Sequence, residues 1–188
     1  MIPAIRKLFI KLFTRKLPLF PYISPASNQY TEETDNLLKG YQFESLVVSK
    51  FTPVHFILHH WRSDKRCGDI FPLSNSYPDL EYEYRDKSLK RKFAVECKWR
   101  ARFIQESVIW ATDLQINNYL KYHYTNDIPV FIILGIGGQA SAPEELYIIP
   151  LEAIGKNQTV LSVDFLQPFK KGGPDEVFFL HPERMEIV

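Results

Sequence analysis

The chain has 188 residues, enough for one domain with a buried core. Its 45% hydrophobic and 24% charged residues are ordinary for a soluble globular protein. The formal net charge of +1 excludes a global attraction for an acidic partner, so any nucleic-acid surface must come from local clusters of Lys and Arg. Two cysteines are too few for a disulfide framework, which predicts a reducing, cytoplasmic setting.

The amino terminus is the most basic part of the chain. Apolar residues at positions 5, 8, 9, 12 and 13 keep helical spacing among five Lys and Arg side chains. This pattern predicts a basic amphipathic helix over residues 1–17, which could pack on the domain, contact nucleic-acid phosphates or lie on an anionic membrane. Prolines at 18, 21 and 25 would end it. We therefore predict a basic segment over residues 1–24 and a single domain over residues 25–188.

The rest of the chain predicts an α/β sandwich around a mixed sheet, because helical and strand-like patterns alternate. In chain order the predicted elements are a helix over 31–50, a strand over 54–61, a hairpin of strands 80–84 and 92–99 around a polar tip at 86–91, a second long helix over 106–123, a buried strand over 129–136, a strand over 146–149, and weaker strands near 159–163 and 176–180.

The predicted hairpin gathers acidic residues. Pairing that is symmetric about the tip puts Glu81 opposite Glu96 and Asp79 opposite Lys98. Because alternate residues of a strand share a face, these four side chains would project to one side. Three neighbouring carboxylates repel one another, and a divalent cation such as Mg²⁺, which prefers oxygen ligands, would remove that repulsion. A register slip of one residue would spoil this geometry.

A further carboxylate lies on the first predicted helix. Glu44 falls in the middle of an apolar stripe formed by Leu37, Tyr41, Val48 and Phe51. A carboxylate that points into a core is costly unless it is hydrogen-bonded or helps to hold a metal. The alternative is a wider stripe with Glu44 at its edge.

These features resemble one nuclease family. The sequence Pro-Asp at 78–79, followed after sixteen residues by Glu-Cys-Lys at 96–98, is similar to the PD-(D/E)xK signature of restriction-endonuclease-like nucleases. The segment GYQFE at 40–44 resembles the glutamate motif on the first helix of that superfamily, and QINNY at 115–119 resembles the QxxxY helix of its RecB-like and related branches. The resemblance implies a restriction-endonuclease-like core, a mixed β-sheet flanked by helices on both faces.

The resemblance also implies a metal site. Asp79, Glu96 and the backbone carbonyl of Cys97 would coordinate Mg²⁺ or Mn²⁺, and Glu44 would complete the shell directly or through water. Asp69, which follows a glycine, is an alternative motif aspartate. The alternation of side chains along the hairpin favours Asp79.

Other residues would act on the substrate by the same resemblance. Lys98 would orient and help to deprotonate the attacking water or steady the charge on the phosphate. Gln115 and Tyr119 share a predicted helical face and would position the water, the lysine or the substrate backbone. Arg100 and Arg102 follow the motif closely and could hold flanking phosphates.

The sequence thus predicts a Mg²⁺-dependent endodeoxyribonuclease. DNA is the expected partner, and RNA, a second copy of the chain and a helicase or repair protein are further candidates. Two alternatives stay open. One is a catalytically inactive nucleic-acid-binding or scaffolding module of the same fold, and the other is a membrane-surface or protein-interaction module that uses residues 1–17.

Overall fold

A computed structural model describes residues 28–62, 76–87, 89–172, 176–181 and 183–187. The predicted basic helix over residues 1–17 and the alternative motif residue Asp69 lie outside these ranges. By its internal contacts the chain divides into Met1–Glu32 and Glu33–Val188. All the described strands belong to the second unit.

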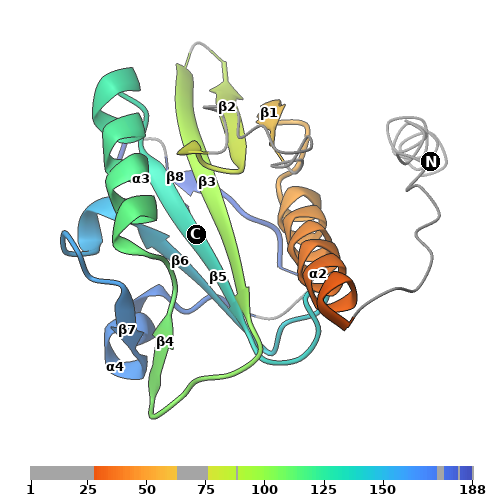
Figure 1. Cartoon of the computed structure of the whole chain (residues 1–188). Coiled ribbons are helices and arrows are strands. Elements are labelled where there is room, and N and C mark those ends of the chain that lie inside the picture. Colours follow the sequence, from red (N-terminus) through yellow and green to blue (C-terminus); the bar gives the residue numbers. More distant parts are fainter. Residues whose placement is uncertain (1–27, 63–75, 88, 173–175, 182, 188) are drawn as a thin grey trace, which may run out of the picture. The chain divides into compact units, whose positions relative to one another are not determined.

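The centre of the second unit is a five-stranded sheet with the strand order β1-β2-β3-β5-β6 (Figure 1). Its strands are β1 (Phe56–Trp61), β2 (Leu80–Asp86), β3 (Leu89–Arg100), β5 (Val130–Ile136) and β6 (Glu145–Pro150). Only β3 and β5 pair in parallel, so the prediction of a mixed α/β sheet is confirmed. Every residue of β5 is buried, as its apolar run predicts for a central strand.

The two long helices are α2 (Asn28–Lys50) and α3 (Asp113–Asn126). The smaller elements are β4 (Ser107–Ile109), η2 (Leu151–Ala153), β7 (Val160–Ser162), α4 (Val163–Leu166), η3 (Gln167–Phe169), β8 (Leu180–His181) and β9 (Glu186–Ile187). The weak strand near 159–163 is therefore confirmed, whereas the one near 176–180 is reduced to a bridge at Phe178 and the start of β8. No helix in the described part of the chain is long and apolar enough to cross a membrane.

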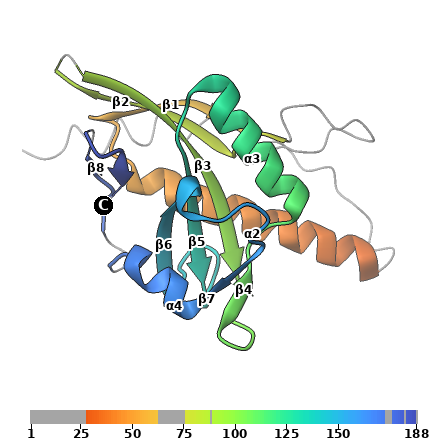
Figure 2. The ribbon, with the colours of Figure 1, turned by 90° about the vertical axis from the view of Figure 1, so that its left-hand side faces the viewer.

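Buried apolar side chains form two separate cores, one on each face of the central strands. Odd-numbered residues of β3 and β5 pack with Phe43 and Val47 of α2. Even-numbered residues of the same strands pack with Ile116, Tyr119 and Tyr122 of α3. Successive side chains of a strand point to opposite faces, so α2 and α3 cover opposite faces of the sheet, as Figures 1 and 2 show.

The predicted helix over 106–123 is wrong in its first part. Residues 107–109 form β4, which pairs with β7, so Val108 lies on a strand and not on a helix. The helix α3 starts only after Thr112, whose hydroxyl accepts the Gln115 N–H while the Gln115 side chain accepts the Thr112 N–H. This capping box satisfies two backbone donors at the helix start and so fixes the boundary.

The predicted apolar stripe of the first helix is also wrong at its start. Leu37 and Tyr41 are exposed, and the buried apolar positions are Phe43, Val47 and Phe51, each four residues from the next. The helix itself is confirmed and begins at Asn28. In the part of α2 whose burial is described, residues 34–50, burial starts at Phe43, so the second half of this helix packs on the sheet.

The hairpin register differs from the prediction by two residues. Leu80 pairs with Val95 and Glu81 pairs with Ala94, not with Glu96. The strands extend further than predicted and leave a shorter turn, in which Lys87 has φ 49°, the left-handed region that tight hairpin turns use. An even shift keeps each side chain on its predicted face, so the carboxylates still project toward α3.

Candidate functional site

Asp79 lies where β2 stops pairing with β3. The backbone pairing of the two strands ends at Leu80. Beyond it, the buried Asp79 carboxylate, and not a backbone carbonyl of β2, accepts the Cys97 N–H at 2.9 Å. The N–H and C=O of one strand residue point to the same neighbouring strand. The Cys97 carbonyl therefore faces the edge at which Asp79 lies and not β5. The Cys97 side chain packs against the core on the α2 face.

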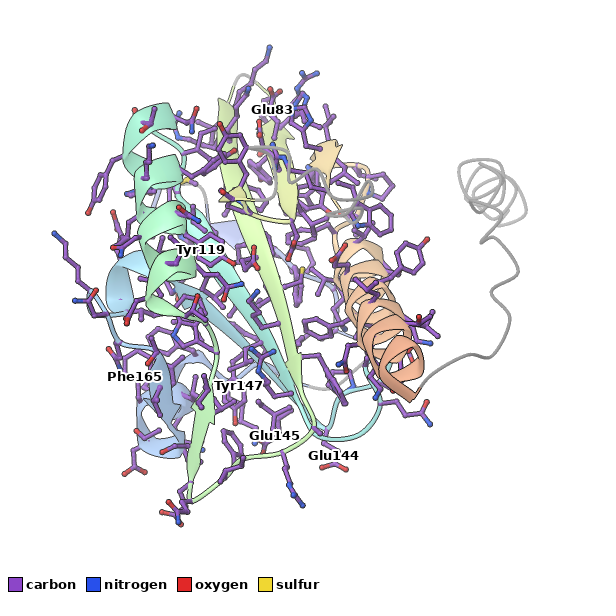
Figure 3. All side chains as sticks on the ribbon, in the orientation of Figure 1. Glu83, Tyr119, Glu144, Glu145, Tyr147 and Phe165 are labelled. Carbon is purple, nitrogen blue, oxygen red and sulfur yellow. The ribbon has the colours of Figure 1, made fainter. Side chains whose placement is uncertain are left out.

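Glu96 is fully buried, at 0% exposed, and makes two short hydrogen bonds through one oxygen. Its Oε1 accepts from Lys98 Nζ at 2.5 Å and from the Tyr119 hydroxyl at 2.6 Å. Tyr119 projects from α3 toward the sheet (Figure 3). Burial raises the pKa of the Tyr119 phenol well above its ordinary value, and the negative charges of Glu96 and Asp79 add to the rise. The phenol therefore stays protonated and acts as a donor.

Glu44 is buried beside an aromatic pair. Its Oε2 accepts the Trp61 Nε1–H at 2.7 Å, and Trp61 stacks on Tyr41 with ring centroids 5.7 Å apart. Trp61 in turn pairs with Leu80, the residue after Asp79. Glu44 is thus linked through Trp61 to the start of β2, which Asp79 directly precedes. The role of Glu44 in a metal shell stays a prediction.

The two residues of the QxxxY motif lie in different settings. Tyr119 contacts Glu96, whereas the Gln115 side chain is engaged in the capping box one turn earlier. The structure therefore brings only the tyrosine of this pair into contact with the motif carboxylate, and a role for Gln115 beyond the cap stays a prediction.

The arginines after the motif also differ. Arg100 donates to the carbonyls of Ile109, Trp99 and Trp110 at 2.8–2.9 Å, and so links the end of β3 to β4. Burial lowers the pKa of Arg100, although Tyr119 and Glu96 act in the opposite direction. Arg102 is exposed in the loop after β3.

A second buried carboxylate has the same kind of partners. Glu81 accepts from the Tyr122 hydroxyl at 2.8 Å and from Arg62 at 3.1 Å. Burial opposes ionisation of Glu81, but these hydrogen bonds and the charge of Arg62 hold its pKa below the ordinary value. Sequence reasoning missed Arg62 and Tyr122. The available signal was the spacing of three between Tyr119 and Tyr122, which puts both on one helical face.

The donors at the end of β3 fit a hard cation. Two carboxylates, from Asp79 and Glu96, and the Cys97 carbonyl are oxygen ligands, and Mg²⁺ keeps several waters of its own. However, no three His, Cys, Asp or Glu side chains in the described part of the chain come close enough to hold a metal by themselves. Each predicted carboxylate of the hairpin also has a partner within the protein, so repulsion alone does not require a cation.

Comparisons with known proteins found similar solved structures but no family. No protein-family model and no curated protein match the chain. A solved structure with a similar backbone is that of Hjc, a Holliday junction resolvase from the archaeal hyperthermophile Archaeoglobus fulgidus. The TM-score is 0.47 with 12% sequence identity, over 71% of this chain and 90% of that chain. A likeness at this level supports no conclusion about function. The functional proposal below therefore rests on the residues of this chain.

Proposed function

We propose that this chain is a metal-dependent nuclease that hydrolyses phosphodiester bonds of DNA. One observation carries the proposal. At the end of β3, the Asp79 carboxylate and the backbone of Cys97 meet, and beside them Glu96 holds both Lys98 and Tyr119. This is the residue set that the PD-(D/E)xK resemblance names.

Asp79, Glu96 and the Cys97 carbonyl would hold Mg²⁺ or Mn²⁺, and Glu44, which accepts a hydrogen bond from Trp61, would complete the shell directly or through water. When bound, the ion would neutralise charge on the phosphate and make a bound water more acidic. The buried position of both carboxylates strengthens their attraction for a cation, because little water screens them.

Lys98 would orient the attacking water and stabilise the phosphate. Its side chain is only 13% exposed and forms an ion pair with Glu96. An ammonium group has three donors and no acceptor, and the ion pair uses one of the donors. A charged Lys98 can therefore direct water and phosphate oxygens, whereas accepting a proton would first require losing its own. The geometry favours the orienting role over that of a general base.

Tyr119 is a positioning residue in this scheme. Its protonated phenol donates to the same Glu96 oxygen as Lys98 and so fixes the rotamer of that carboxylate. The capping box fixes where α3 begins, and Tyr119 lies on the buried face of that helix.

A cleavage assay tests the proposal. Purified wild type, Lys98→Ala and Lys156→Ala, an exposed lysine beyond β6, are incubated with single-stranded, duplex and four-way-junction DNA and with RNA, in Mg²⁺, Mn²⁺ or a chelator. We expect metal-dependent cleavage of DNA by wild type and Lys156→Ala, and a loss of about 10²–10³-fold in Lys98→Ala, the size seen when a transition-state donor is removed. Thermal melting confirms that each variant is folded. A folded wild type that binds neither metal and cleaves no substrate would contradict the proposal.

A second candidate is a catalytically inactive nucleic-acid-binding module. It is favoured by the partners that both motif carboxylates already have within the protein, the Cys97 N–H for Asp79 and the Lys98 ammonium for Glu96. This candidate predicts binding of DNA in chelator, no binding of Mn²⁺ and no cleavage. Metal binding therefore separates the two candidates even when the right substrate is missing from the assay.

A further inference from the structure

A cavity of about 730 Å³ lies beside the candidate site, between the β2–β3 hairpin and the carboxyl end of α3. Its described lining includes Arg62, Tyr77, Lys90, Arg91, Lys92 and Tyr122. Glu81, which also lines the cavity, shares a sheet face with Asp79 and Glu96, and Tyr122 is one turn after Tyr119. A ligand in the cavity would thus lie next to the candidate site.

The lining concentrates positive charge. Four of its described residues are Lys or Arg and two are acids, Glu81 and Asp127, in a chain whose total charge is only +1. Glu81 is neutralised by Arg62, and Lys92 lies 3.9 Å from its other oxygen. The exposed side chains of Lys90 and Arg91 add charge at the hairpin rim. The cavity is therefore suited to an anionic ligand such as a phosphate group.

The same cavity offers aromatic surface. The rings of Tyr77 and Tyr122 lie 5.2 Å apart, and the Arg62 guanidinium lies 5.6 Å and 6.0 Å from their centroids. Tyr77 remains 40% exposed. Nucleobases stack on aromatic rings and on guanidinium planes. A base inside a duplex is already stacked on both faces, so this surface suits an unpaired nucleotide. The volume lies within the range of small-ligand sites.

We propose that this cavity binds an unpaired nucleotide of a nucleic-acid strand, with the base against Tyr77 and the phosphates toward Lys90 and Arg91. The inference rests on the proposed function for one point only, that the strand held here leads to Asp79 and Glu96. Binding itself requires neither metal nor cleavage. A free mononucleotide has the same chemistry and is distinguished by competition.

The test is fluorescence anisotropy in a metal chelator, with a labelled single-stranded oligonucleotide and a blunt duplex of equal length. Tyr77→Leu removes the ring and Tyr77→Phe keeps it. The double variant Lys90→Ala/Arg91→Ala is matched by Lys156→Ala/Lys171→Ala, which loses the same charge at two lysines outside the described lining of the cavity. Thermal melting confirms folding of each variant.

We expect tighter binding of the single strand than of the duplex. Tyr77→Leu should weaken that binding roughly 5- to 150-fold, the range of base–aromatic stacking, and Tyr77→Phe should leave it unchanged. Loss of two phosphate contacts should lower the salt dependence of single-strand binding by about 1.4 in slope, with no change in the matched double variant. These measurements are made in chelator and need no cleavage, so a failure of catalysis alone would leave the results intact.

Three outcomes would overturn the inference. The first is equal binding of single strand and duplex, and the second is equal effects of Tyr77→Leu and Tyr77→Phe. The third is displacement of the oligonucleotide by a free mononucleotide at comparable concentration, which would assign the cavity to a small nucleotide.

Discussion

Replacing Lys98 by Met should destabilise the fold strongly in the absence of metal. The change keeps most of the side-chain volume and removes the charge that faces the fully buried Glu96. Two unit charges 2.5 Å apart attract with about 7 kcal/mol at an effective dielectric constant of roughly 20. Desolvation of the ammonium offsets part of this attraction. Because the Glu96 carboxylate would stay buried without its cationic partner, we expect a loss of about 3–5 kcal/mol in unfolding free energy, a drop of roughly 6–20 °C in Tm for a domain of this size.

Urea unfolding of metal-free protein at neutral pH measures this loss. The matched control is Lys170→Met, which breaks an ion pair with Glu145 of similar length, 2.7 Å, whose side chains are 40% and 32% exposed. That control should lose no more than about 1 kcal/mol. Adding Glu96→Gln to Lys98→Met should restore much of the stability, since it removes the buried charge and keeps an acceptor for Tyr119. A loss in Lys98→Met as small as in the control, or a double variant less stable than Lys98→Met, would refute this reasoning.

Three further outcomes follow from the same contacts. Gln115→Ala should lower the unfolding free energy by about 0.5–2 kcal/mol because it breaks the capping box. Gln115→Glu keeps the capping box and should retain both stability and cleavage. A stable Gln115→Glu variant that does not cleave would assign Gln115 to the reaction. The folded pKa of Glu81 is below its ordinary 4.5, so its stabilisation is complete above that pH and is lost as pH falls through the folded pKa. Glu81→Gln should therefore flatten the acid limb of the unfolding free energy, measured by urea titration, and an unchanged limb would contradict the assigned hydrogen bonds. In Arg100→Lys the lysine cannot donate to all three carbonyls, so the unfolding free energy should fall by about 1–3 kcal/mol in the same assay. Unchanged stability together with weaker DNA binding would instead assign Arg100 to phosphate binding.

The sequence predicted those parts of the fold that depend on short-range periodicity. The apolar run before Gly137 identified the central strand, and alternation placed Asp79, Glu96 and Lys98 toward one face. The exact register was missed because it depends on the length of the hairpin turn, which the polar residues around Lys87 do not specify. Because the register differs by an even number of residues, every side chain keeps its predicted face, and the prediction that the hairpin carboxylates share one face is unaffected.

The missed features depend on contacts between distant segments. The start of α3 was predicted too early because Val108 fits helical spacing with the residues that follow, and only its pairing with β7 shows that it lies on a strand. The sequence did not predict a role for Arg62 and Tyr122, because both contact Glu81 only in the folded chain and are far from it in sequence. Contacts of this kind also give each hairpin carboxylate a partner within the protein, a cation for Glu81 and Glu96 and a backbone N–H for Asp79, whereas the sequence pattern predicted a metal in that role.

The most direct test of the central claim is calorimetric titration of Mn²⁺ into wild type, Asp79→Asn and Asp86→Asn, since metal binding needs no knowledge of the substrate. Asp86 is an exposed acid at the hairpin turn and gives a matched loss of charge. We expect one Mn²⁺ site in wild type and in Asp86→Asn, and none in a folded Asp79→Asn. No binding to wild type, or equal binding to all three proteins, would contradict a metal centre at Asp79 and Glu96.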